Sequence, residues 1–275
     1  MSVIARAHTG FVPSLRRVYA LVLRHTYLLR SSGPRILELM YWPTVQMILW
    51  GFITLFLINH SSWIAQASGV LLSAVLLWDV LFRSQLGVSL VFMEEMWSRN
   101  LGHLFVSPLR PYEWRISMVL YSMIRALIGM IPAALMAIPF YGFSIFDLGW
   151  PMLLLFFNLM LMGWWLGLTI TAMLIKAGPG AESLAWALTF LLAPFCAVYY
   201  PVAMLPEWLQ HISNALPASH VFEGLRSLVQ DGRVDTHAIT TAFSLNCLYM
   251  AISLCLVQLS FNSARKAGTL LQSGE

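Results

Sequence analysis

Apolar blocks, each close to the length of a membrane-spanning helix, follow one another along most of the chain. About 20 apolar residues in a helix are enough to cross the hydrocarbon core of a bilayer. Six such blocks stand between more polar segments, and we expect each to be a transmembrane helix. The predicted ranges are 36–59, 63–92, 116–140, 150–175, 183–200 and 238–261. The second range exceeds what a bilayer needs, so its end should project into the cytoplasm.

The segment before the first block has a different pattern. Over residues 12–31 the apolar side chains recur at helical spacing, and arginines lie off that stripe. The stripe consists of Leu15, Val18, Tyr19, Val22 and Leu29, and the arginines are Arg16, Arg17 and Arg24. This pattern predicts an amphipathic helix that lies on the cytoplasmic surface of the membrane. The Ser-Ser-Gly-Pro sequence at 31–34 should end it. No short apolar core follows Met1, so we do not interpret the N-terminus as a signal peptide.

Composition supports a membrane protein. Of the 275 residues 59% are hydrophobic and only 10% are charged, whereas soluble domains carry about 25% charged residues. The net charge of +4 is better explained by cytoplasmic arginines than by nucleic-acid binding. Cys196, Cys247 and Cys255 lie within apolar blocks without CxxC spacing. We therefore interpret them as small hydrophobic side chains and not as disulfides or metal ligands.

The distribution of Lys and Arg predicts the orientation. Cytoplasmic segments of membrane proteins are enriched in these residues. One side of the predicted topology holds Arg6, Arg16, Arg17, Arg24, Arg30, Arg35, Arg99, Arg110, Arg115, Lys176, Arg265 and Lys266. The other side holds Arg226 and Arg233. We therefore expect both termini and the loops at 93–115 and 176–182 to be cytoplasmic in a multi-pass membrane protein.

Charged residues inside predicted spans are candidates for function. Asp79 and Arg83 are four residues apart, so they share a helix face and can pair. Arg125 lies deep in the third predicted span. Our structural interpretation, which we favour, is a buried pair or network that holds spans together, with Arg125 bonded to backbone carbonyls. The alternative is a polar lining or gate, and a proton-coupled secondary transporter would use Asp79 and Arg125 as its relay.

Catalytic and nucleotide-binding patterns are missing from the sequence. The seven histidines have no ligand spacing, so a metal site is not expected. A P-loop requires a Gly-Lys step, but Lys176 follows Ile175 and Lys266 follows Arg265. Any ATP that drives this protein must therefore be hydrolysed by another chain. The Gly87-Val88-Ser89 sequence lacks the second glycine of a serine-nucleophile elbow, which argues against an intramembrane hydrolase.

Residues 93–110 are too patterned for a simple connection. The spacing predicts one short amphipathic helix that ends at Ser107-Pro108, with an apolar side made of Met93, Met96, Trp97, Leu101 and Leu104. On one interpretation the helix rests on lipid. On the other, Glu94, Glu95 and Arg99 meet a soluble partner, with both carboxylates solvated in the free chain.

Residues 204–235 form a second patterned segment. Proline and glycine punctuation predicts two short helices, at about 206–215 and 219–230. The first should have Trp208, Leu209, Ile212 and Leu216 on one side, and the second Val221, Phe222, Leu225, Leu228 and Val229. We expect this pair to re-enter the outer half of the membrane. The alternative is a folded external loop on the membrane surface.

Both segments resemble one family, the type-2 ABC transporter permeases. The acidic pair Glu94-Glu95 and the Leu-x-x-Ser-Pro-Leu-Arg sequence at 104–110 resemble the family's cytoplasmic loop. The Leu-Pro-x-x-Leu-Gln-x-Ile-Ser-x-x-Leu-Pro sequence at 205–217, followed by Glu-Gly-Leu-Arg at 223–226, resembles its extracellular re-entrant element. The amphipathic helix and six spans fit the same family.

The resemblance implies a non-catalytic permease subunit of an ABC exporter. It would form a homodimer, bind two ATP-binding cassette ATPases that hold ATP and Mg²⁺, contact membrane lipids and transport an amphipathic, lipid-linked or glycan-like substrate. It implies a coupling element at Glu94, Glu95, Trp97, Arg99, Asn100 and Leu101, and an exit element at Pro206, Trp208, Pro217, Glu223 and Arg226. The predicted organisation is a cytoplasmic segment (1–35), a six-helix transmembrane domain (36–261) and a cytoplasmic tail (262–275).

Overall fold

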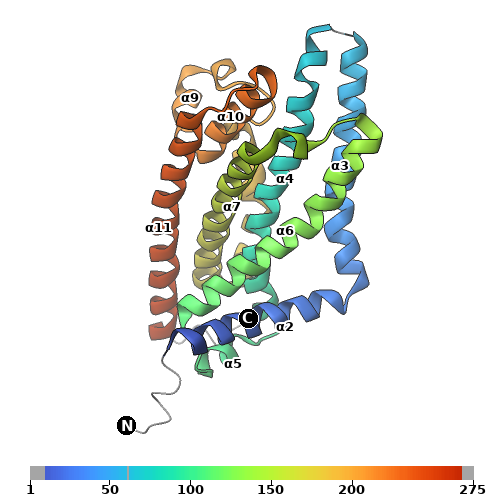
Figure 1. Ribbon diagram of the computed structural model, residues 1–275. Coiled ribbons are helices and arrows are strands. Elements are labelled where there is room, and N and C mark those ends of the chain that lie inside the picture. Colours follow the sequence, from blue (N-terminus) through green and yellow to red (C-terminus); the bar gives the residue numbers. More distant parts are fainter. Residues whose placement is uncertain (1–9, 61, 268–275) are drawn as a thin grey trace.

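The computed structural model describes residues 10–60 and 62–267, and over these ranges every regular element is a helix (Figure 1). Within them, five helices are long and apolar enough to cross a membrane. They are α3 (Gly33–His60), α4 (Ser62–Trp97), α6 (Pro111–Tyr141), α7 (Gly149–Ala177) and α11 (Thr236–Ala267). An all-helical membrane fold and five of the six predicted spans are therefore present. The predictions for residues 1–9, Ser61 and 268–275 lie outside the described residues.

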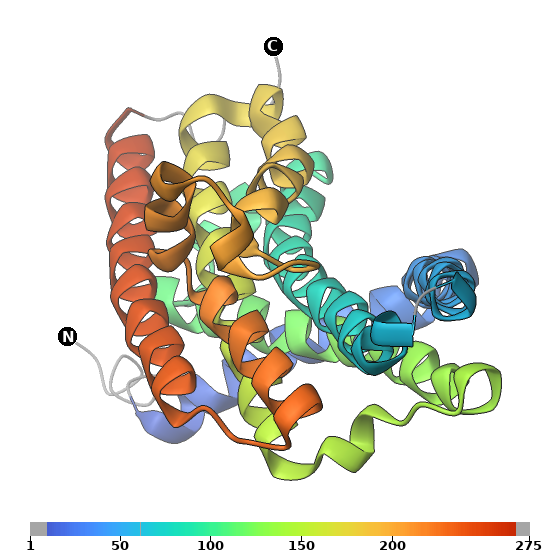
Figure 2. The ribbon, with the colours of Figure 1, turned by 90° about the horizontal axis from the view of Figure 1, so that it is seen from above.

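Helices α4 and α7 form the centre of the bundle. Their membrane-length segments are mostly buried, whereas those of α3 and α11 are mostly exposed. Seen from above, α3 and α11 lie at opposite edges of the molecule (Figure 2). Gly163 and Gly167 of α7 lie directly against α4, since a Cβ on either would come within 2.7 Å of a backbone oxygen, that of Leu81 or Gln85. Small residues at such contacts let helices approach closely in a membrane, where backbone packing replaces the hydrophobic effect.

The predicted fifth span, 183–200, is not one helix. Helix α8 (Glu182–Leu192) gives way to the 3-10 turn η3 (Ala193–Cys196), and Ala197 then has a left-handed backbone with φ of 51°. Pro194 explains the break because it has no backbone N–H for an α-helical hydrogen bond and its ring crowds the preceding turn. Hydropathy alone does not register this break, since residues 193–200 are almost all apolar.

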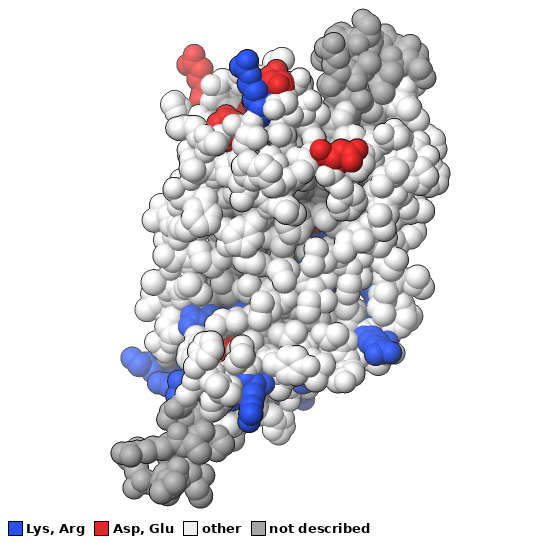
Figure 3. Space-filling view, in the orientation of Figure 1, with Lys and Arg blue, Asp and Glu red and all other residues white. Residues whose placement is uncertain are grey.

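The amphipathic N-terminal helix is present as α2 (Phe11–Arg30). Only part of the predicted stripe faces the protein: Val18 and Leu29 are buried, whereas Leu15 and Tyr19 are exposed. The helix lies across the lower end of the bundle, close to the short helix α5 (Leu101–Val106) (Figure 1). This end carries most of the visible Lys and Arg side chains, and the visible acidic side chains gather mainly at the opposite end (Figure 3). We call it the cationic end.

The opposite end is covered by two short helices, joined to the bundle through the 3-10 turn η4 (Val202–Met204) (Figure 2). They are α9 (Glu207–Asn214) and α10 (Pro217–Asp231), within two residues of the predicted ranges. The apolar side of α10 packs into the protein, where Val221, Phe222 and Leu225 are fully buried. In α9, by contrast, Trp208 and Ile212 are exposed. The existence of the pair is thus confirmed, and its depth in a membrane stays a prediction.

Candidate coupling site at the cationic end

The segment 93–110 is divided between two helices. Residues 93–97 are the last turn of α4, and α5 begins only at Leu101. Arg99 has a left-handed backbone with φ of 54°, which turns the chain between them. The single helix predicted from the apolar spacing is therefore wrong. The apolar residues nevertheless share one side. Two separate helices bury Met93, Met96, Leu101 and Leu104 against the protein, and this is why the apolar spacing continues across the turn.

Glu95 stabilises this turn from inside the protein. Its carboxylate accepts hydrogen bonds from the Arg24 guanidinium at 2.6 and 3.1 Å and from the Asn100 side-chain amide at 2.6 Å. The Asn100 backbone N–H also donates to the Glu95 carbonyl. Glu95 is only 1% exposed, so the expected solvated carboxylate is wrong at this position. The bulk of α2 and the turn itself exclude water from it, and the guanidinium supplies the charge that makes burial tolerable.

Glu94 faces two other arginines. One of its carboxylate oxygens lies 3.4 Å from an Arg35 nitrogen and 3.9 Å from an Arg125 nitrogen. The Arg125 guanidinium also lies over the Tyr121 ring at 5.9 Å. Arg125 therefore lies beside the Glu94 carboxylate, whereas we had expected it to bond to carbonyls, and Asp79 and Arg83 pair with each other. The bundle brings 94 and 125 together because α4 and α6 pack along their length.

A second arginine–carboxylate pair fastens α2 to the first turn of α6. Arg17 Nε and Nη2 donate to the two oxygens of Glu113 at 2.8 and 2.6 Å. Glu113 also accepts from the Arg110 backbone N–H at 2.9 Å, so it caps the start of α6 as well. Sequence reasoning placed Arg17 on the polar side of the amphipathic helix but assigned neither Arg17 nor Glu113 to a site. The Glu at the third position after a proposed helix start was a usable signal for the cap, but nothing in the sequence indicates its partner 96 residues away.

His25 lies buried beside Glu95 and Tyr121. Its Nε2 is 3.7 Å from a Glu95 oxygen, its ring centroid is 5.3 Å from that of Tyr121, and neither ring nitrogen makes a hydrogen bond within the described structure. Burial lowers the pKa of His25 to about 4; the guanidinium groups of Arg24 and Arg125 act in the same direction and Glu95 opposes them. The imidazole is therefore neutral at physiological pH. The positive charges beside Glu94 and Glu95 come from arginine side chains.

The outer side of this site presents different groups. Trp97 is 52% exposed at the end of α4, and Ser98 and Arg99 beside it are exposed, whereas Leu101 is buried. The carboxylates of the predicted coupling element thus face inward while an aromatic ring and a guanidinium face outward. Such a surface offers an aromatic ring and a guanidinium to another protein, while Glu95 stays buried behind it.

The Asp79–Arg83 pair forms as predicted from its spacing, with Arg83 Nε 2.5 Å from Asp79 Oδ2. A Cβ on Gly129 of α6 would lie 2.7 Å from Arg83 Nε, so the guanidinium crosses the face of α6 at that glycine. This observation supports the structural interpretation of the pair, in which it helps to join α4 to a neighbouring span.

At the opposite end, Glu223 and Arg226 hold the broken helix. Arg226 Nη2 donates to the Ala197 carbonyl at 2.9 Å, and Arg226 also pairs with Glu223 at 3.1 Å. Glu223 accepts from the Val202 backbone N–H at 2.8 Å. The Glu-Gly-Leu-Arg sequence therefore satisfies carbonyls left free where η3 ends. Pro206 precedes α9, Pro217 begins α10, and Trp208 projects from α9.

Polar contacts within the bundle join the spans at further points that the sequence did not indicate. Asn246 of α11 accepts from the Trp165 indole at 3.0 Å and donates to Asn158 of α7. Thr189 of α8 donates to Gln85 of α4 at 2.8 Å. Within the described residues there is no cluster of His, Cys, Asp and Glu suited to a metal ion. The contacts of Asn246, Trp165, Thr189 and Gln85 therefore help to hold α4, α7, α8 and α11 together.

A bundle with five helices of membrane-spanning length and apolarity defines the chain as a multi-pass membrane protein. Comparison with known families is specific: residues 27–229 match the ABC-2 type transporter domain. Because the match covers most of the chain, the protein belongs to the ABC-2 type transporter family. Its membrane domain is a permease component, and membership implies an ATP-binding cassette partner. A search of curated proteins found no match.

Proposed function

We propose that this chain is the permease subunit of an ABC exporter and that it pairs with a second copy and two ATP-binding cassette ATPases. It would lie in the bacterial inner membrane with both termini in the cytoplasm. ATP and Mg²⁺ would be held by the ATPases, since this chain has no Gly-Lys step. The alternative of a proton-coupled transporter has no support, because the proposed relay residues Asp79 and Arg125 have separate partners.

One observation carries the proposal. In a chain that belongs to the ABC-2 family, α5 and the exposed Trp97–Arg99 turn protrude at the cationic end and are fixed from behind by buried carboxylates. A contact made there would act on both α4 and α6, because the turn continues α4 and α5 leads through residues 107–110 into α6. We therefore assign coupling to the predicted residues in two roles. Glu94, Glu95 and Asn100 hold the element, Leu101 anchors it in the core, and Trp97 and Arg99 meet the ATPase.

The proposed transport path runs beside α4 and α8. Aromatic rings line up there: Trp50 of α3 stacks on Tyr199 at 4.6 Å, and Phe82 of α4 lies 5.1 Å from Phe190 of α8. Ring faces of this kind suit an amphipathic, lipid-linked or glycan-like substrate. The exposed sides of α3 and α11 leave room for lipid and for the second copy. The pair α9–α10 would close the outer exit, with Trp208 and Ile212 in the outer leaflet.

Co-purification tests the proposal. A tagged chain extracted from native membranes in mild detergent should bring down a protein with a P-loop, identified by mass spectrometry. The two together should hydrolyse ATP and the isolated chain should not. Recovery of this chain alone, together with uptake into liposomes driven by a proton gradient, would contradict it and favour the secondary transporter.

Thiol labelling tests the depth of α9. A cysteine at Trp208 or Ile212, in a background without the three native cysteines, should resist a membrane-impermeant reagent, and one at Asp231 should react. Leu225 is unsuitable because it is buried in protein, where a cysteine would resist the reagent at any depth. Rapid reaction at both α9 positions would place that helix in water and remove the exit gate.

A further inference from the structure

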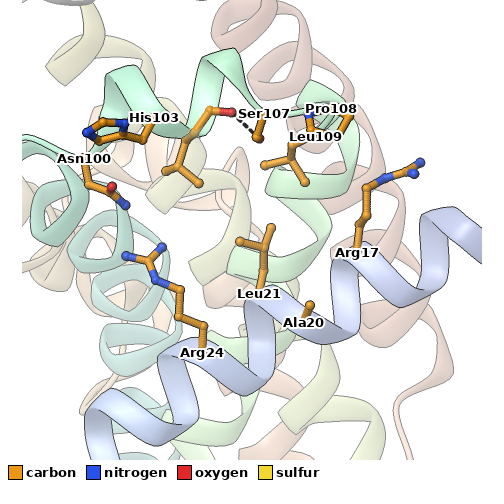
Figure 4. A pocket seen from close by; sticks show the side chains of 10 residues that line it. Arg17, Ala20, Leu21, Arg24, Asn100, His103, Ser107, Pro108 and Leu109 are labelled. Carbon is orange, nitrogen blue, oxygen red and sulfur yellow. Dashed lines mark hydrogen bonds between the residues drawn. The ribbon is translucent and has the colours of Figure 1, made fainter. Parts of the chain in front are cut away.

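Arg115 of α6 differs from most arginines of the cationic end, which are either bound to carboxylates or exposed to water. Figure 4 shows Arg17 and Arg24 on α2, and these two donate to the carboxylates of Glu113 and Glu95. The exposed arginines of the same end are Arg16, Arg30, Arg99 and Arg265. Arg115 is partly buried and belongs to neither group.

The Arg115 side chain lies between the start of α6 and the lower part of α11 (Figure 1). Within residues 10–60 and 62–267, Arg115 makes no ion pair, and its side chain makes one hydrogen bond, from Nη1 to the Leu254 carbonyl at 3.3 Å. Its Nε is buried and makes no hydrogen bond there. A carbonyl inside a helix already accepts from the N–H four residues further on, so it compensates the charge only in part. Because burial of a guanidinium without an anion is costly, the geometry indicates an anionic group from outside the chain.

The position of Arg115 corresponds to the depth of lipid headgroups. About 20 helical residues cross the hydrocarbon core, and counted from the start of α11 at Thr236 they end close to Gln258. The Leu254 carbonyl lies one turn before that point. Arg115 is also the fifth residue of α6, so both helices place its guanidinium at the boundary of the hydrocarbon. In the proposed orientation this boundary belongs to the cytoplasmic leaflet.

The surfaces on either side of the guanidinium match the two parts of a phospholipid. Toward the middle of the bilayer, Ile116 and Leu120 of α6 are exposed apolar side chains one turn apart. Toward the cationic end, Gln258 and Asn262 of α11 are partly buried, and Gln258 Nε2 donates to Asn262 Oδ1 at 3.2 Å. Gln258 is four residues from Leu254, so the amides follow the contacted carbonyl on the same side of α11. The order is therefore apolar surface, cation and amide groups, which suits acyl chain, phosphate and headgroup.

We propose that Arg115, with Gln258 and Asn262, binds the phosphate of an anionic membrane lipid between α6 and α11. Guanidinium groups pair well with phosphate oxygens, and cationic pockets between transmembrane helices at the cytoplasmic side bind anionic headgroups. The phosphate would accept from the Nη groups, on the side of the guanidinium that is not buried. A lipid held there would link the start of α6 to α11, which packs mainly against α7 and α10.

Nanodiscs of defined composition test the site on the full chain. The unmodified protein and Arg115→Gln are placed in phosphatidylcholine, with or without phosphatidylglycerol, and thermal unfolding is followed. Phosphatidylglycerol should raise the midpoint of the unmodified protein by roughly 2–4 °C and leave that of Arg115→Gln unchanged. Arg16→Gln, which removes an exposed arginine and the same charge, should respond like the unmodified protein.

A purely structural role for Arg115 predicts a different result. If the side chain serves only to hold the Leu254 carbonyl, Arg115→Gln should be less stable in both lipid compositions and should gain as much from phosphatidylglycerol as the unmodified protein. That equal gain would overturn the inference. Inorganic phosphate added to phosphatidylcholine nanodiscs should not raise the midpoint, and a full rise with phosphate alone would overturn the assignment to a lipid.

Native mass spectrometry identifies the occupant. Released from nanodiscs that contain both lipids, the unmodified protein should retain phosphatidylglycerol and Arg115→Gln about one fifth as much. Arg115→Lys should retain an intermediate amount, because lysine keeps the charge but not the planar group with several donors. If protein from native membranes carried a glycan-bearing lipid that Arg115→Gln loses, the site would belong to the transport substrate and the membrane-lipid assignment would be overturned.

Discussion

The seam between α4 and α7 in the middle of the bundle and the seam between α2 and the ends of α4 and α6 are built from different contacts. In the first, Gly163 and Gly167 bring backbone against backbone. In the second, the buried carboxylates of Glu95 and Glu113 bind arginines of α2. A span surrounded by lipid gains little from apolar burial alone, so close packing is needed there. At the membrane surface, charged groups can pair at lower cost and also fix the direction of a helix.

The largest effect is expected from a side chain in the middle seam. Gly163→Leu would drive carbon atoms into the Leu81 carbonyl and the Gln85 amide, 2.7 and 2.9 Å from the missing Cβ. Backbone cannot move aside as a flexible side chain can, so α4 and α7 should separate and no folded protein should be recovered. Gly180→Leu, where nothing lies within 4 Å, is the control. Monodisperse Gly163→Leu protein at normal yield would show that the seam tolerates a gap.

Breaking the Arg17–Glu113 ion pair, which fixes α2 to α6, should lower the stability of the protein without preventing it from folding. Arg17→Ala leaves the Glu113 carboxylate without its cation, and removing one partner of such an ion pair is destabilising. Arg16→Ala removes an exposed arginine from the next position and should change stability by less than about 0.5 kcal/mol. Unfolding by sodium dodecyl sulfate in mixed micelles measures both. Equal stability of the two variants would mean that the Arg17–Glu113 pair does not hold α2 in place.

A double variant separates charge from packing. Arg17→Ala combined with Glu113→Gln removes the uncompensated carboxylate and should recover part of the lost stability, because the remaining amide still accepts from the Arg110 N–H. If the double variant were as unstable as Arg17→Ala alone, the loss would come from the stem of Arg17 and not from the buried charge.

Lowering the pH should reduce the stability of the contact between α2 and the ends of α4 and α6, because His25 is buried there as a neutral ring. Its pKa is about 4 in the folded protein, below the ordinary 6.5, so the unfolded chain takes up a proton first as the pH falls. The stability contributed by the neutral ring is complete above pH 6.5 and is lost progressively down to pH 4, by at most about 3 kcal/mol. His25→Gln should flatten this part of the stability curve, measured by thermal unfolding in detergent. His211→Gln, on exposed α9, should leave the curve unchanged.

The smallest effect on stability is expected at the exposed turn after α4, away from the ion pairs of α2. Trp97→Ala removes a ring that is half exposed, so its unfolding free energy should stay within about 0.5 kcal/mol of the unmodified protein. The amount of co-purified ATPase should nevertheless fall, because exposed aromatic residues often dominate protein interfaces. If the Trp97→Ala variant co-purifies with as much ATPase as the unmodified protein, the exposed side of the turn does not contact the ATPase.

Hydropathy and local spacing predicted much of the fold. They placed five spans, the amphipathic helix and the pair at 206–230, because each depends on the side chains of one short segment. The Asp79–Arg83 pair was predictable for the same reason, since both residues lie one turn apart on one helix. The break at Ala193 was missed because apolar composition does not distinguish a span from an interrupted one.

Only the tertiary structure decided what the charged residues of the cationic end do. The sequence indicated that Glu94 and Glu95 matter and that Arg17 and Arg24 lie off an apolar stripe, but it gave no link across the 71 residues from Arg24 to Glu95. Packing of α2 beneath α4 and α6 made that link and turned the carboxylates inward. Hydropathy is a sum over neighbours in the chain, whereas an ion pair depends on the distance between two atoms, which exists only once the helices have packed.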